Sequence, residues 1–219
     1  MKIGIIDYGS GNLHSVHHSV AHAAAMKTDM QVQTLSDTEN LKNCDYIIVP
    51  GVGHFADCWV GLSAIDGMVE VLREAVLEKA KPFLGICVGM QLLADEGHEG
   101  GNITPGLGWI SGKVRHFSDC LDSDSYSHLK IPHMGWNQLR LTQSDHKICA
   151  SLPAQVQMYF VHSYVFDELP ASNILAVADY GLSVPALIGR DNIIGTQFHP
   201  EKSQQAGQAM LDAFLSWRP

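Results

Sequence analysis

Short strand-like runs alternate with longer amphipathic segments in the first half of the chain. Four such runs, each followed by a turn, predict strands at residues 2–7, 31–35, 46–50 and 82–86. Between them, apolar positions recur at helical spacing over 12–25 and 61–80, and a further helix is expected over 88–95. Strands that alternate with helices across short turns are typical of a parallel sheet with helices on its faces.

The pattern changes after about residue 110. Short β-like runs separated by turns occur at 138–141, 157–165, 174–179, 184–190 and 193–198. A last apolar stripe predicts a closing helix over 203–217, whereas the Asp- and Ser-rich stretch 118–130 predicts an exposed loop. We therefore expect one α/β domain over residues 1–219, with a mostly parallel sheet that is extended by antiparallel hairpins in its C-terminal half.

Composition and charge exclude several classes of protein. The 219 residues are 46% hydrophobic and 17% charged, as in an ordinary globular chain. A net charge of −9 argues against a surface for nucleic acid or for an anionic membrane. We find no apolar run long enough for a secretory signal or a membrane span. Five widely spaced cysteines without a CxxC pair argue against disulfides and a zinc site, so we expect a cytoplasmic protein without a metal.

The sequence G-x-C-x-G at 85–89 is the strongest candidate for chemistry, because it lies between a predicted strand and a predicted helix. A nucleophile at such a turn is held in a strained conformation at the carboxyl edge of the sheet. The start of the helix favours the thiolate of Cys87, and the amide of Val88 would point towards an oxyanion. The alternative is a buried structural cysteine, which this position between strand and helix disfavours.

The segment GTQFHPE at 195–201 supplies a base and an orienting group for this thiol. Side chains at i and i+2 of an extended segment face the same way, so His199 and Glu201 can lie side by side. Pro200 favours an extended conformation of the residue before it. The alternative is a surface His-Pro-Glu that caps the next helix, and the presence of Cys87 upstream favours a triad instead.

Two glycine-containing turns follow other predicted strands. The turn PGVG at 50–53 lies at the same sheet edge, and its glycines allow a peptide to flip and present the N–H of Val52 or Gly53 as a second oxyanion donor. An ordinary turn is the alternative there. The turn GSGNLH at 9–14 resembles a dinucleotide fingerprint, but His14 replaces the third glycine. No GxxxxGK[ST] loop is present either, so we expect no nucleotide and no cofactor.

The motifs GICVGMQLL at 85–93 and QFHPEKS at 197–203 together resemble the class I glutamine amidotransferase family. DYGSGNL, PGVG, PHMGWN and YFVHSY match members of that family that serve histidine biosynthesis, and the likeness runs over residues 2–217. The resemblance implies a flavodoxin-like α/β fold and hydrolysis of L-glutamine to glutamate and ammonia through a thioester on Cys87. His199 would protonate the leaving amine and then activate water, oriented by Glu201.

The resemblance also implies substrate contacts and a partner. The positions implied to contact glutamine are Gly53, Gln91, Ser163 and Tyr164. The partner would be a (βα)8-barrel cyclase subunit that receives the ammonia within a heterodimer. The positions implied to lie at that interface are Asn12, Tyr159 and Lys202.

Other functions are open at this point. One is a glutaminase subunit of a different synthase, for example in surface-sugar, vitamin B6 or aromatic-acid synthesis. Another is a non-catalytic binding subunit in which Cys87 is only a redox-sensitive thiol. Because a lone glutaminase would waste glutamine, we also expect low basal activity, with the loop 50–53 misoriented until the partner and its ligand bind.

Overall fold

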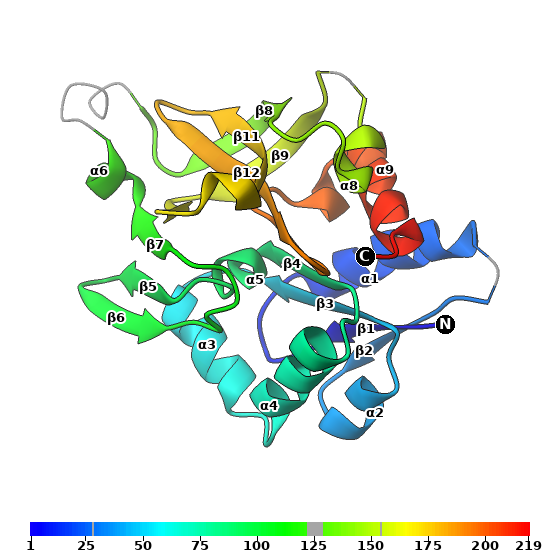
Figure 1. The fold of residues 1–219 in the computed structure, drawn as a ribbon. Helices are drawn as coiled ribbons and strands as arrows, with labels where there is room; N and C mark the ends of the chain where they lie inside the picture. The colour runs from blue at the N-terminus through cyan, green and yellow to red at the C-terminus, as the bar shows by residue number, and fades with distance from the viewer. Residues whose placement is uncertain (28, 122–128, 154) are drawn as a thin grey trace.

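A nine-stranded mixed sheet forms the centre of the molecule in the computed structural model, which describes residues 1–27, 29–121, 129–153 and 155–219 (Figure 1). The strand order is β2-β1-β3-β4-β13-β12-β11-β8-β9. Neighbours are parallel from β2 to β13 and antiparallel from β13 to β9. The expected fold class, a mostly parallel sheet with an antiparallel extension, is confirmed.

The strands of the parallel half are short and largely buried. They are β1 (Lys2–Ile6), β2 (Gln31–Leu35), β3 (Tyr46–Gly51), β4 (Phe83–Cys87) and β13 (Ile193–Thr196). The antiparallel half consists of β8 (His133–Leu141), β9 (Gln157–His162), β11 (Ile174–Asp179) and β12 (Ser183–Arg190). In the register of the sheet, Gly51 pairs with Cys87 and Thr196 pairs with Ile86. The carboxyl ends of three parallel strands therefore meet at one edge of the sheet.

Helices cover both faces of this sheet (Figure 1). The first helix, α1 (Leu13–Ala25), is capped by Asn12, whose side chain accepts from the amide of Ser15, and it packs against α9 (Gln204–Ser216). Both helices were predicted, and both are confirmed. The opposite face carries α2 (Thr38–Lys42), α3 (Phe55–Ser63) and α4 (Met68–Arg73). Shorter helical turns are α5 (Val88–Gln91), α6 (Phe117–Cys120), α8 (Lys147–Ala150) and Ala171–Asn173.

The single helix predicted over 61–80 is wrong. Helix α3 already begins at Phe55 and ends at Ser63, and Gly67, in a left-handed conformation with φ of 69°, directly precedes α4. Helix α4 then runs into a π-helical turn at Glu74–Glu78. The helix expected over 88–95 is likewise only the four-residue α5. Four residues after α5 ends, the Asp95 carboxylate accepts hydrogen bonds from the Gly112 amide (3.0 Å) and the Ser111 hydroxyl (3.1 Å).

A second, four-stranded sheet was not predicted. Its order is β10-β7-β5-β6, with β5 (Glu96–Glu99), β6 (Asn102–Pro105), β7 (Lys113–His116) and β10 (Tyr164–Asp167). The continuous strand expected over 157–165 is therefore wrong, because β9 and β10 belong to different sheets. The chain bends at Ser163, where the imidazole of His162 lies 2.8 Å from the carbonyl oxygen of Tyr164. Most of the expected loop at 118–130 lies outside the described residues.

Over the described ranges, we find no helix with the length and apolar character needed to cross a lipid bilayer.

Candidate active site

Cys87 lies where β4 ends and α5 begins. Its backbone is strained, with φ of 54° and ψ of −110°, and its side chain is almost fully buried. Because Gly51 is its partner in the sheet register, the thiol lies at the edge where β3 also ends. This strand-turn-helix geometry is the one that the G-x-C-x-G motif predicts.

The two glycines of that motif are required by close packing. A Cβ on Gly89 would overlap the carbonyl oxygen of Val49, and a Cβ on Gly85 would overlap the backbone of Gly89. Neither glycine has the positive φ that excludes other residues. The turn that carries Cys87 therefore packs directly against the backbone of β3.

His199 and Glu201 form a buried pair next to this turn. The imidazole Nδ1 lies 2.8 Å from a Glu201 carboxylate oxygen, and both side chains are 2% exposed. His199 itself is extended, but the chain then enters a 3-10 turn at Pro200–Lys202, so the predicted extended segment ends earlier than expected. The predicted contact between the two side chains is nevertheless present.

The surroundings of His199 favour its charged form. Burial of the ring lowers its pKa, but hydrogen bonding and charge from Cys87 and Glu201 outweigh burial and raise the pKa of His199 to about 9. The buried Nε2 atom has no well-aligned hydrogen-bond partner among the described residues, yet the nearby Cys87 thiol raises the pKa of His199. A protonated imidazole beside a thiol is the arrangement that stabilises a thiolate.

These groups open into a cavity of about 350 Å³, which is in the range of small-molecule sites. Its lining consists of Asn12, Val52, Gly53, Cys87, Val88, Gln91, Val161, His162, Ser163, Tyr164, His199 and Lys202. The cavity thus brings together the predicted thiol and base with all the predicted oxyanion and glutamine-contacting positions. Glu201 lies behind His199. Tyr159 is outside the lining and accepts a hydrogen bond from the His199 amide through its carbonyl oxygen (2.9 Å).

The loop 50–53 is held by the turn after β1. The amide of Val52 donates to the Ser10 hydroxyl oxygen (3.2 Å), and that hydroxyl donates to the Val52 carbonyl oxygen (2.8 Å). The Tyr8 hydroxyl donates to the carbonyl oxygen of Pro50 (2.5 Å). The N–H of Val52 is therefore engaged by Ser10 and is not free to bind an oxyanion.

Two polar residues of the site have no predicted role. His162 lines the cavity, and Gln197 lies with its amide nitrogen 3.8 Å from the sulfur of Cys87. Both residues lie inside motifs that carry the family resemblance, YFVHSY and QFHPEKS. Their place in those motifs is the sequence signal that could have identified them as site residues.

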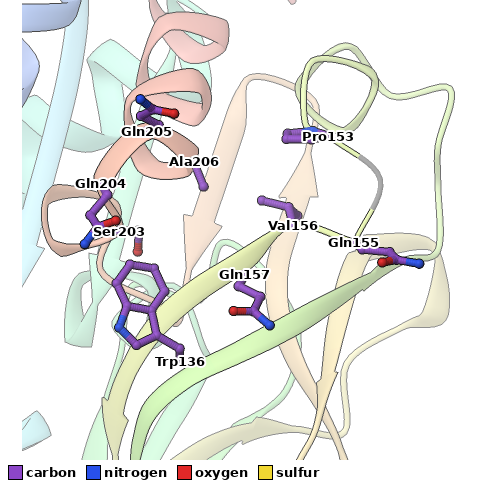
Figure 2. Close-up of a pocket in the computed structure, with 9 residues that line it drawn as sticks. All are labelled: Trp136, Pro153, Gln155, Val156, Gln157, Ser203, Gln204, Gln205 and Ala206. Carbon is purple, nitrogen blue, oxygen red and sulfur yellow. The ribbon is translucent and has the colours of Figure 1, made fainter.

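A larger hollow elsewhere on the molecule lacks comparable chemistry. Its volume is about 780 Å³, and it lies between the start of α9 and the start of β9, with Trp136 at one end (Figure 2). Its lining contains no thiol and no ionisable side chain. In the described part of the chain, we also find no group of three or more His, Cys, Asp or Glu side chains placed to hold a metal ion.

The site combines a strained cysteine at a strand-turn-helix junction with a buried His-Glu pair, on a sheet that has helices on both faces. Comparison with known proteins identifies the class of enzyme that has these features. The family model described as "Glutamine amidotransferase class-I" matches residues 4–216. The chain belongs to the class-I glutamine amidotransferase family, as its motifs predicted.

The similar proteins narrow this class further. The chain is 48% identical to "Imidazole glycerol phosphate synthase subunit HisH" of Brucella suis and to the subunit of the same name of Rhodospirillum rubrum, with both chains covered completely in each case. Among solved structures, a glutamine amidotransferase is similar with a TM-score of 0.70 and 18% identity, covering 97% of this chain and 98% of that one. A putative GMP synthase protein from Thermoplasma acidophilum has a TM-score of 0.65 and 19% identity, covering 98% and 92%. These two structures show the shared fold.

Proposed function

We propose that the protein is the glutaminase subunit of imidazole glycerol phosphate synthase, with one amidotransferase domain over residues 1–219. The observation that carries the proposal is the meeting of Cys87, His199 and Glu201 at one cavity. The full-length relatives of that name support the choice of synthase. In this role the protein hydrolyses L-glutamine, and a cyclase subunit uses the ammonia to make imidazole glycerol phosphate and aminoimidazole-carboxamide ribotide in histidine biosynthesis.

The proposed chemistry uses the triad in two half-reactions. The Cys87 thiolate attacks the carboxamide carbon of glutamine, and a C–S bond forms as the carbonyl oxygen takes up negative charge. His199, as imidazolium, gives its proton to the leaving nitrogen, so that ammonia departs and a γ-glutamyl thioester remains. His199 then takes a proton from water, which attacks the thioester and releases glutamate and the thiolate. Glu201 holds the proton of His199 on Nδ1 and stabilises the imidazolium.

Backbone groups around the thiol complete the site in this proposal. The amide of Val88, the first residue of α5, would bind the oxyanion, and a second donor would come from Val52 or Gly53 once the loop 50–53 changes its conformation. Gln91, Ser163 and Tyr164 would hold the amino and carboxylate groups of glutamine, because they line the same cavity.

The proposed partner surface lies around the mouth of the cavity. Asn12 and Lys202 line the cavity, and Tyr159 packs its ring against exposed Trp136 with 6.0 Å between the ring centroids. We infer that a (βα)8-barrel cyclase binds here to form a heterodimer and receives ammonia directly from the cavity. The five cysteines are free thiols, which supports a cytoplasmic location for the complex.

Glutamate release from glutamine, measured with and without the cyclase subunit and its nucleotide ligand, tests this function. We expect release to depend on the partner, because the Val52 amide is engaged by Ser10 in the isolated chain. Release that needs Cys87 but ignores this cyclase would favour a different synthase. Absence of release under every condition would favour a non-catalytic binding subunit.

Replacing Ser10 with alanine should raise the basal release of glutamate by about fivefold without the cyclase. The hydroxyl holds both polar groups of Val52, and a net hydrogen bond of about 1 kcal/mol corresponds to roughly that factor. Steady-state assays of the isolated subunit measure the effect. Ser151→Ala is the matched control, because among the described residues its hydroxyl donates only to the Lys147 carbonyl oxygen (2.9 Å). An unchanged basal rate in Ser10→Ala would show that this contact does not restrain the loop.

A further inference from the structure

Two buried histidines that the triad does not use lie side by side behind the cavity. His133 on β8 and His162 on β9 are partners in the sheet register, and Nδ1 of His133 lies 2.9 Å from Nε2 of His162. Both side chains are buried. Two imidazoles in contact need a defined arrangement of protons, because one nitrogen must donate and the other must accept.

The groups at the two ends of this pair fix that arrangement. At the cavity end, Nδ1 of His162 lies 2.8 Å from the carbonyl oxygen of Tyr164, which can only accept, so Nδ1 carries the proton. At the outer end, Asn137 accepts from the Gln138 amide through its oxygen (2.8 Å) and donates to the Asp179 carbonyl through its nitrogen (3.0 Å). The same nitrogen lies 3.2 Å from Nε2 of His133 and therefore donates to it.

The groups at the two ends of this series of hydrogen bonds fix the proton positions between the two histidines. A neutral His162 with its proton on Nδ1 accepts at Nε2, and His133 must then donate from Nδ1. All donors point in one direction, from Asn137 through both imidazoles to Tyr164. A second proton on either ring would bring two donors face to face, and burial lowers the pKa of His133 to about 4 and that of His162 to about 3.

The aromatic side chains around His133 keep its ring in place. It stacks between Phe160 and Tyr180, with centroid distances of 4.7 and 4.0 Å and interplanar angles of 19° and 20°. The ring of Phe117 also contacts the pair, tilted against His162 with 5.3 Å between the ring centroids and edge-on to His133 with 6.4 Å between them. Aromatic packing therefore holds the rings that form this series of hydrogen bonds in fixed positions.

The carbonyl oxygen of Tyr164 connects the histidine pair to the substrate cavity. It also faces the side-chain nitrogen of Gln91 (3.3 Å), and that nitrogen donates as well to the side-chain oxygen of Gln197 (3.0 Å). Both hydrogens of the Gln91 amide are therefore used. Its oxygen accepts no hydrogen bond from any described residue, and Gln91 lines the cavity. The network thus leaves an acceptor available at the cavity.

We propose that His133 and His162 are positioning residues that orient the Gln91 amide for the α-ammonium group of L-glutamine. By holding the Tyr164 carbonyl, they keep the Gln91 nitrogen turned away from the substrate and the Gln91 oxygen turned towards it. This inference rests on the proposed function, because it concerns the same cavity and the same substrate.

Two substitutions at His133 separate positioning from general stability. His133→Leu removes the donor to His162, whereas His133→Asn keeps an amide nitrogen near the place of Nδ1. In the assembled synthase, we expect His133→Leu to raise the KM for L-glutamine about tenfold, with a smaller change in kcat. His133→Asn should restore most of the difference. Unfolding temperatures of both variants show whether each chain folds.

A glutamine analogue without the α-amino group, glutaramate, makes the test specific. The kcat/KM for glutaramate should fall far less than that for L-glutamine in His133→Leu, because glutaramate has no ammonium group for Gln91 to bind. Equal losses for the two substrates, or no loss, would overturn the proposal and assign the pair a purely structural role.

Nitrogen-15 NMR of the histidine side chains tests the proton arrangement without any activity. Both His133 and His162 should show a protonated Nδ1 and a bare Nε2 at neutral pH. The opposite tautomer at either residue would overturn the proposal. The expected tautomers in a wild type that hydrolyses no glutamine, with or without the cyclase, would instead overturn the proposed function.

Discussion

Replacing Cys87 with serine should lower glutamate release by the assembled synthase about 10⁴-fold or more. A serine hydroxyl is far less acidic than a thiol, so His199 cannot hold it as the attacking anion, and loss of a catalytic nucleophile commonly has an effect of this size. Steady-state release of glutamate from glutamine measures the loss. The variant should fold normally, because the replaced atom is a single buried sulfur.

Two controls make this result specific. Ammonium salts should still support the cyclase reaction in the Cys87→Ser complex, because the partner then receives ammonia from solution. Cys120→Ser should keep full activity. Cys120 is more exposed than Cys87, but burial and the Asp167 carboxylate raise its pKa to about 11, so iodoacetamide should label Cys87 first. Substantial glutamate release by Cys87→Ser would contradict the triad.

Replacing Glu201 with glutamine, or His199 with asparagine, should produce the second largest losses. His199→Asn removes the group that moves both protons, so we expect a fall in kcat of about 10³- to 10⁴-fold. Glu201→Gln keeps the shape of the pair but removes the charge that stabilises the imidazolium, so its loss should be smaller. Measuring kcat and KM separately checks that glutamine still binds. Near-normal kcat in His199→Asn would exclude His199 as the proton carrier, and near-normal kcat in Glu201→Gln would exclude a role for the Glu201 charge.

The same pair predicts a pH dependence of stability. The pKa of His199 is raised to about 9 in the folded chain, above its unfolded value near 6.5. The folded state therefore binds more protons between these values, and the stability that the pair contributes is complete below about pH 6.5 and is lost as the pH rises through about 9. Unfolding temperatures of wild type and Glu201→Gln should converge over this range. A constant difference from pH 6 to 10 would contradict the assigned charge.

The sequence was most informative where burial is complete and periodicity is regular. The parallel strands, α1 and α9 follow directly from apolar spacing, and Cys87 and His199 follow from motifs at strand ends. The second sheet was missed because β5, β6 and β7 are only four residues long and mostly half-buried or exposed, so they lack a clear alternation.

Other differences arose from single residues and from tertiary contacts. The left-handed Gly67 interrupts a stripe that otherwise has helical spacing throughout. The pairing of His133 with His162 depends on strands β8 and β9, because these two residues are 29 positions apart in the chain. Local pattern carries no information about such a contact. The relative positions of the site residues therefore follow from the three-dimensional arrangement of the strands and not from the local sequence.

The packing of Gly89 on Val49 has a consequence for engineering. Mutational libraries that vary the nucleophile turn should yield almost no functional clones at positions 85 and 89, because an added carbon at either position displaces backbone rather than a side chain. Diversity in the facing loop should be tolerated far better at the exposed Val52, whereas Gly51 packs against Tyr8 and Gly89, and Gly53 has a φ of 90° that strains any other residue. Directed evolution of a partner-independent glutaminase should therefore vary the facing loop and keep the turn that carries Cys87 unchanged.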